Sequence, residues 1–110
     1  MDNAKIEKCR EMARELVGKM TLEEAASQLK FDAPAIPRLG IPAYNWWNEA
    51  LHGVARAGTA TVFPQAIAMA AMFDTEGMEK IADIISTEAR AKFNAQSAEG
   101  DRGIYKGLTM

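Results

Sequence analysis

The chain has 110 residues, enough for one small domain, and 48% apolar with 25% charged residues is a globular composition. With 13 Lys and Arg against 15 Asp and Glu, it offers no basic stripe to nucleic acid or to an anionic membrane. No stretch is long and apolar enough to span a bilayer, so neither nucleic acid nor a membrane is an expected partner.

The first predicted element is an amphipathic helix from Ile6 to Met20, where apolar residues recur at helical spacing and Lys, Arg and Glu fill the other side. The single cysteine, Cys9, cannot form an internal disulfide and is expected on the buried face of this helix. The alternation of charged and apolar residues differs from a secretory signal. A cytoplasmic location is therefore expected if Met1 is the natural start.

A second, short helix is predicted to begin after Thr21 and to continue through Leu29. Thr21 and Glu24 have the spacing of a capping box, in which each side chain accepts a hydrogen bond from a backbone N–H of the first turn. Glu23 and Glu24 are adjacent on this helix and point in different directions. They are interpreted as capping and surface residues, and not as a catalytic pair.

The middle of the chain is predicted to be extended. Three prolines and a glycine within Phe31–Pro42 exclude a regular helix there. The aromatic-rich run Ala43–Trp47 has the composition of a buried strand, and Asn48–Gly53 marks its carboxyl end.

The second half is predicted to be mainly helical. Pro64 suits the first position of a short helix, and Asp74 suits the cap of a long one from Thr75 to about Ala95. Ser97–Gly103 is expected to be a polar loop and Ile104–Met110 the start of another strand. The apolar residues expected on these two helices are Ile67, Met69, Ala70 and Met72 on the first, and Met78, Ile81, Ile85, Ala89 and Phe93 on the second.

This order of elements predicts an α/β fold that is incomplete within residues 1–110. One or two short strands flanked by helices cannot form a stable sheet alone, because a βαβ unit buries its strands only when further elements cover both faces. Unpaired strand edges and uncovered helix faces favour association. The isolated chain is therefore expected to be marginally stable and to self-associate.

The densest group of chemically useful residues is Trp46–Gly53, at the expected carboxyl end of the first strand. That end of parallel strands is where ligands bind in α/β folds. A carboxylate such as Glu49 accepts hydrogen bonds from sugar hydroxyls, and the flat face of a pyranose lies against an indole such as that of Trp47. Paired tryptophans are also common in cores and interfaces, so a purely structural role stays open.

The remaining motifs indicate no catalytic, metal or cofactor site. His52 is the only histidine and has no cysteine or second histidine at ligand spacing, so we interpret it as a hydrogen-bonded structural residue. The sequence has neither a Gly-rich phosphate loop nor a Ser or Cys nucleophile with a suitable partner.

The segment that begins at Ile36 and reads IPRLGIPAYNWWNEALHGV resembles glycoside hydrolase family 3, specifically its β-xylosidase-like members. Four further stretches support the resemblance, which covers nearly the whole chain: LVGKMTLEE from Leu16, FPQA from Phe63, ISTEARA from Ile85 and GIYKGLT from Gly103. The resemblance implies that residues 1–110 are the amino-terminal fragment of a (β/α)8 TIM-type barrel domain. It also implies a retaining mechanism without metal or cofactor, whose nucleophile and acid/base residues lie beyond Met110.

Carried over by position, Glu49 corresponds to an acidic residue that grips the non-reducing sugar. Glucosidase-like members have Asp-Gly-Pro-His-Gly where this chain has Glu49-Ala-Leu-His-Gly53. The longer Glu49 and Trp47 would fill the space of a hexose hydroxymethyl group, which favours xylose. The predicted function is removal of terminal β-linked xylose from xylo-oligosaccharides by the parent enzyme, with the isolated chain inactive. The alternatives are a β-glucosidase, a dual arabinofuranosidase, or a non-catalytic helical interaction module.

Overall fold

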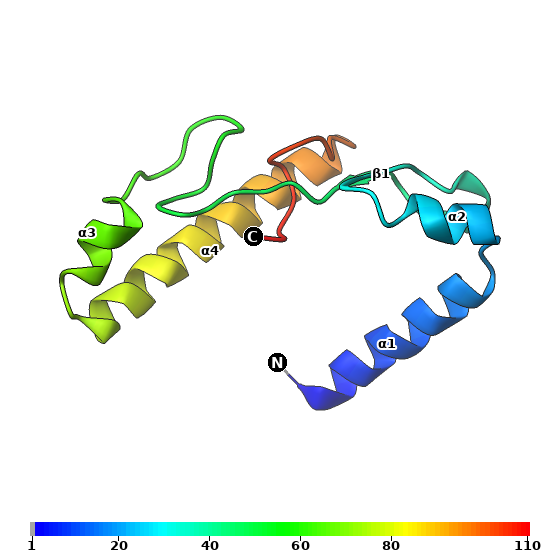
Figure 1. Cartoon of the computed structure of the whole chain (residues 1–110), viewed down its shortest axis with the longest axis horizontal. Helices are drawn as coiled ribbons and strands as arrows, with labels where there is room; N and C mark the ends of the chain where they lie inside the picture. Colours follow the sequence, from blue (N-terminus) through cyan, green and yellow to red (C-terminus); the bar gives the residue numbers. More distant parts are fainter. Residues whose placement is uncertain (1) are drawn as a thin grey trace. The chain divides into compact units, whose positions relative to one another are not determined.

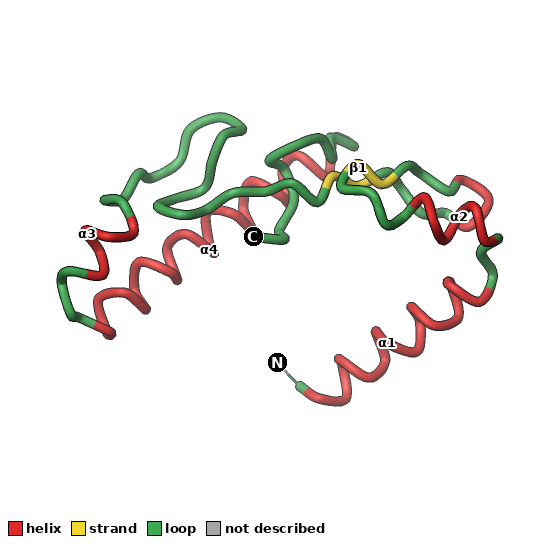
Figure 2. Tube along the Cα trace, viewed as in Figure 1, coloured by secondary structure: helices red, strands yellow, loops and turns green. Residues whose placement is uncertain are grey.

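The computed structural model describes residues 2–110. They form two compact units that divide between Ala43 and Tyr44. Helices supply most of the regular structure, and loops connect them (Figures 1 and 2). The only strands in the described part are β1 (Asp32–Ala33) and β2 (Tyr44–Asn45). The prediction of a mostly helical chain with one or two short strands is confirmed. Across residues 2–110, no helix has the length and apolar character that a bilayer span needs.

The first unit begins with α1 (Asn3–Gly18), which confirms the predicted amphipathic helix. It starts earlier than expected because Asp2 caps it: the Ala4 N–H donates to Asp2 Oδ1 at 3.1 Å. The helix buries none of its residues, and Cys9 is exposed. The expectation of a buried Cys9 was wrong, because periodicity identifies an apolar stripe but does not supply the surface that covers it.

The second helix, α2 (Leu22–Ser27), confirms the capping box and ends two residues earlier than predicted. The Glu24 N–H donates to Thr21 Oγ1 at 3.2 Å, and the Thr21 N–H donates to Glu24 Oε2 at 2.9 Å. Glu24 also forms a two-pronged ion pair with Arg38, whose Nε lies 2.7 Å from Glu24 Oε1. Arg38 donates further to the Lys19 carbonyl at 2.7 Å. A carboxylate expected to face solvent therefore joins α2 to the segment that follows it.

Protonation of Glu24 is expected to loosen this corner of the first unit. The Arg38 side-chain hydrogen bonds, followed by the Thr21 N–H, hold the pKa of Glu24 below its ordinary value of 4.5. A lowered pKa in the folded state means that the stabilisation is present above pH 4.5 and disappears as the pH falls through the folded value. In an NMR titration of the 110-residue chain, Glu24 should titrate below 4.5, and Arg38→Ala should move its midpoint upward. A midpoint unaffected by Arg38→Ala would show that the pair does not persist in solution.

The connection after α2 is extended, as predicted, except for the 3₁₀ turn η1 (Pro37–Leu39). Backbone hydrogen bonds in both directions join Ile36 and Ile41, at 2.9 and 3.2 Å, across this turn. Gly40 ends the turn with φ of 67°, a conformation that glycine adopts without steric cost. Ile36 and Ala33 are the buried side chains of this unit.

The second unit begins with β2, which is shorter and less buried than the strand predicted for Ala43–Trp47. Its two residues are half-buried, and Trp46 and Trp47 beyond it are 50% and 54% exposed. The prediction of a buried five-residue strand was wrong because composition indicates strand propensity, whereas burial depends on the elements that cover a strand, which composition does not specify.

The longest element of the second unit is α4 (Thr75–Ala98), which confirms the predicted long helix. Its predicted Asp74 cap is also confirmed, because the Gly77 N–H donates to Asp74 Oδ1 at 2.9 Å. Its predicted face carries the one buried residue of the helix, Ala89. The short helix α3 (Ala66–Ala70) follows Gln65 as its cap, so Pro64 precedes the helix and the prediction that it opens the first turn was wrong. The loop that precedes α3 (Figure 1) is joined to α4 at Thr59 and Thr61 by hydrogen bonds from Lys92 and to Glu88.

The segment Ile104–Met110 forms turns in place of the predicted strand. Its backbone N–H groups are taken by the segment around β2: Gly107 donates to Asn48 Oδ1 at 2.7 Å, and Leu108 donates to the Tyr44 hydroxyl at 3.0 Å. Side-chain acceptors replace a neighbouring strand here. The strand prediction was wrong because hydrogen bonds to residues distant in sequence fix this backbone.

Candidate functional site

The acidic residue singled out from the sequence, Glu49, lies at the base of a short loop. The Ala55 N–H donates to the Glu49 carbonyl at 3.0 Å and closes the loop, which places Arg56 beside Glu49. Arg56 Nε lies 3.3 Å from Glu49 Oε2. The Glu49 side chain retains 30% of its exposure, so the carboxylate is paired on one oxygen and open to solvent. It can accept a hydrogen bond from a ligand without first losing its partner.

The tip of the loop is fixed by His52 and Gly53. The Phe63 N–H donates to the His52 carbonyl at 2.8 Å, and His52 Nδ1 lies 3.0 Å from the Phe63 carbonyl. Because a carbonyl only accepts, His52 Nδ1 carries the proton in this contact. Gly53 has φ of 121°, and a Cβ there would stand 2.2 Å from the Thr61 carbonyl oxygen. The interpretation of His52 as a hydrogen-bonded structural residue is confirmed.

The segment of residues 59–61, which follows the loop in the chain, is attached to α4 by charged side chains. Glu88 accepts from the Thr61 hydroxyl at 2.6 Å and from the Thr61 N–H at 3.0 Å. The hydrogen bond from the Thr61 hydroxyl lowers the pKa of Glu88 most, and the hydrogen bond from the Thr61 N–H lowers it further. Lys92, one turn further along α4, donates to the Thr59 carbonyl at 2.9 Å. The longest helix therefore supports the loop that carries Glu49.

The tryptophan pair, Trp46 and Trp47, precedes the loop in the chain. The Trp46 and Tyr44 rings meet edge to face, 4.8 Å between centroids. The Trp47 N–H donates to Asn45 Oδ1 at 2.9 Å, and the Trp47 carbonyl accepts from the Tyr105 N–H at 3.0 Å. Both indoles are about half exposed. Their solvent-facing surface is available to a flat apolar ligand face, as well as to another part of a larger protein.

The structure brings the predicted residue Glu49 together with two residues that the sequence did not single out, Arg56 and Tyr105. The Arg56 guanidinium carbon lies 5.7 Å from the centroid of the Tyr105 ring. Tyr105 in turn is tied to the Trp47 backbone. No periodic or spacing signal in the sequence could have indicated this set, because Tyr105 is far from the loop along the chain. Within residues 2–110, no three His, Cys, Asp or Glu side chains converge as metal ligands would.

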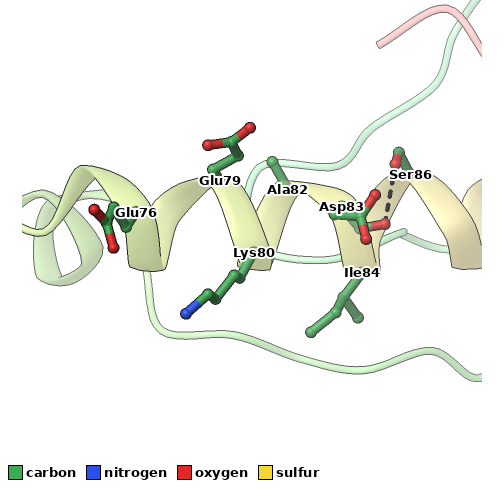
Figure 3. Close-up of a pocket in the computed structure, with 7 residues that line it drawn as sticks. All are labelled: Glu76, Glu79, Lys80, Ala82, Asp83, Ile84 and Ser86. Carbon is green, nitrogen blue, oxygen red and sulfur yellow. Dashed lines mark hydrogen bonds between the residues drawn. The ribbon is translucent and has the colours of Figure 1, made fainter.

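The surface hollow drawn in Figure 3 lies on α4 and does not include Glu49 or the tryptophans. All seven of its residues belong to α4: Glu76, Glu79, Lys80, Ala82, Asp83, Ile84 and Ser86. The side chains splay around the helix and do not face one another (Figure 3). One helix cannot enclose a ligand, so this hollow does not define a binding site.

No protein family model matches the chain. Individual relatives do match. Probable β-D-xylosidase 7 of Arabidopsis thaliana is 51% identical over 98 residues, which covers 80% of this chain and 13% of that protein. A probable exo-1,4-β-xylosidase of Neosartorya fischeri is 45% identical over 97 residues, 78% of this chain and 13% of that protein. Xylan 1,4-β-xylosidase of Xylanibacter ruminicola is 48% identical over 85 residues, 77% of this chain and 10% of that protein.

By these matches, the chain is homologous to a segment of glycosidases. More narrowly, the relatives are named as β-xylosidases, and the resemblance to β-xylosidase-like proteins is confirmed. A match over 77 to 80% of the chain necessarily includes its central residues, and thus Glu49. The chain spans only 10 to 13% of the length of these curated relatives.

Proposed function

We propose that residues 1–110 form part of the sugar-binding side of a glycoside hydrolase that removes terminal β-linked xylose from xylo-oligosaccharides. The observation that carries this proposal is the 45 to 51% identity to proteins named as β-xylosidases, over a segment that includes Glu49. The finer proposal is that the segment is the amino-terminal fragment of a (β/α)8 barrel domain of glycoside hydrolase family 3. A mostly helical chain with two short strands is compatible with the first units of such a barrel.

In this proposal Glu49 and Trp47 hold the sugar. The solvent-facing part of the Glu49 carboxylate accepts a hydrogen bond from a ring hydroxyl, and the exposed indole of Trp47 covers an apolar ring face. Glu49 is one methylene longer than the aspartate of glucosidase-like sequences, which reduces the space for a hydroxymethyl group. This difference is the reason to prefer xylose over glucose.

The chemistry itself requires two carboxyl groups placed on opposite sides of the scissile bond. We propose that both come from the parent enzyme outside residues 1–110, and that the reaction proceeds with retention through a covalent glycosyl-enzyme intermediate. Glu49 has a binding role in this scheme, because its carboxylate is paired with Arg56 and no second carboxylate accompanies it within the described loop, residues 49–55.

The full-length protein that contains this segment is expected to release xylose from xylo-oligosaccharides, with β-xylose as the first anomer formed. Proton NMR during the first minutes of the reaction distinguishes this anomer from α-xylose, which forms later by mutarotation. If α-xylose came first, the retaining mechanism would be excluded. If glucose were released from gluco-oligosaccharides in preference, the choice of xylose would be wrong.

The 110-residue chain, assayed beside the full-length protein on an aryl β-xyloside, should show no hydrolysis above background. Positioning by one carboxylate cannot replace both nucleophilic attack and proton donation to the leaving group. Saturable turnover by the short chain that Glu49→Ala abolishes would contradict this expectation.

A second candidate function, a helical interaction module, is favoured by the exposure of large apolar side chains. Among the described residues only four apolar side chains are buried, Ala33, Ile36, Met69 and Ala89, whereas both tryptophans are half exposed. Size-exclusion chromatography and a circular dichroism melt of the isolated chain separate the two candidates. A compact species with one sharp transition favours a module. A self-associating chain without such a transition favours a piece of a larger enzyme.

A further inference from the structure

Arg56 directly follows the loop, and it is paired with the proposed sugar-binding residue Glu49. Its side chain is 68% exposed, and it contacts two groups from different parts of the second unit: Glu49 Oε2 at 3.3 Å and the Tyr105 ring at 5.7 Å. A long arginine in solvent would otherwise sample many rotamers. The ring contact on one side reduces that freedom and keeps the guanidinium beside the carboxylate.

The loop backbone places Arg56 next to Glu49. The Ala55 N–H is bonded to the Glu49 carbonyl at 3.0 Å, directly beside the ion pair. Tyr105 is anchored by its own backbone hydrogen bond to Trp47 at 3.0 Å. The two residues that Arg56 contacts, Glu49 and Tyr105, are therefore each held by a backbone hydrogen bond.

The ion pair with Arg56 involves only one oxygen of the Glu49 carboxylate, Oε2. Arg56 contacts Oε2 of Glu49, and among the described residues no hydrogen bond to Oε1 is found. A carboxylate that is ion-paired through one oxygen samples fewer orientations than a free glutamate, which rotates about three side-chain bonds. A fixed acceptor costs less entropy when a ligand hydroxyl binds to it.

We propose that Arg56 is a positioning residue for sugar binding: it holds Oε2 of Glu49, with Tyr105 as the surface that supports its guanidinium, so that Oε1 is presented to a ring hydroxyl of the sugar. This inference rests on the proposed function. It assigns to Arg56 an effect that is transmitted only through Glu49.

The test is a double-mutant cycle in the full-length protein, with kcat/KM measured on an aryl β-xyloside. Arg56→Ala should lower kcat/KM about two- to fivefold, the range for a solvent-exposed charge pair. The same substitution in the Glu49→Ala background should cause no further loss, because its target is gone. Arg56→Lys, which keeps the charge but loses the planar fork, should fall between wild type and Arg56→Ala.

The control is Arg90→Ala, which removes another arginine that lies over an aromatic ring, Phe93 at 6.0 Å, on α4. It should leave kcat/KM and the melting temperature unchanged. The melting temperature of Arg56→Ala should also remain near that of wild type, because the side chain is largely exposed.

The outcomes distinguish a failure of the positioning role from a failure of the proposed function. An equal loss from Arg56→Ala with and without Glu49 overturns the positioning role and leaves the proposed function standing, as does no loss in either background. If the wild-type protein does not hydrolyse the xyloside, the proposed function fails and the inference fails with it. If the wild type is active and Glu49→Ala has no effect, the sugar-binding role of Glu49 fails, and the positioning role of Arg56 with it. A loss confined to the wild-type background and partly restored by lysine supports both.

Discussion

Glu49→Ala in the full-length protein is expected to lower kcat/KM on xylosides about 10- to 100-fold. The side chain is proposed to hold a ring hydroxyl, and hydrogen bonds to a charged group contribute about 1.5 to 3 kcal/mol. This free energy corresponds to the stated change in rate. Steady-state kinetics on aryl β-xyloside and aryl β-glucoside provide the measurement.

The same substitution should relax specificity. Without the longer side chain, the space for a hydroxymethyl group opens, so glucoside hydrolysis should fall less than xyloside hydrolysis, or rise. Equal losses on both sugars would keep Glu49 in the site but remove the reason for preferring xylose. Unchanged activity on both with a lowered melting temperature would make Glu49 a structural residue of the loop.

Gly53→Ala should damage both stability and activity of the full-length protein. The backbone at Gly53 has φ of 121°, where an L-residue is strained, and the added Cβ would lie 2.2 Å from the Thr61 carbonyl oxygen. Strain of this kind costs on the order of 1 to 3 kcal/mol, and the clash with backbone adds to it. The loop must move to relieve this clash, and the movement should displace Glu49 at the base of the loop. We expect the displacement to lower kcat/KM about tenfold or more. Thermal melts and kinetics measure the two effects.

The control for this prediction is Gly103→Ala in the same unit. A Cβ at Gly103 meets nothing closer than Asp101 Oδ1 at 3.6 Å, which is an ordinary contact. We expect a change in unfolding free energy within about 0.5 kcal/mol, as for other surface substitutions. If Gly53→Ala behaved like Gly103→Ala, the tight approach of the loop to Thr61 would not exist in solution.

The environments of Glu24 and Glu49 follow from the nearby sequence to different extents. The capping role of Glu24 follows from its spacing to Thr21, because both hydrogen bonds close within one helical turn. Its ion pair with Arg38 and that of Glu49 with Arg56 cross a turn or loop whose path the sequence does not state. Residue type and spacing identified both carboxylates, but their partners depend on how the backbone returns.

Local sequence patterns predicted α1, the capping box of α2, and the long helix α4 with its Asp74 cap. The segment that contains Trp47 and Glu49 carried the resemblance. These features depend on contacts within about one turn of helix or on residue identity alone. The three-dimensional arrangement was needed to show that Cys9 is exposed, that residues 104–110 form turns, and that Arg56 lies beside Glu49 with its guanidinium over the Tyr105 ring. Burial, and pairing between segments that are distant in sequence, depend on how the chain closes on itself. No local sequence pattern encodes this closure, because it involves residues far apart along the chain.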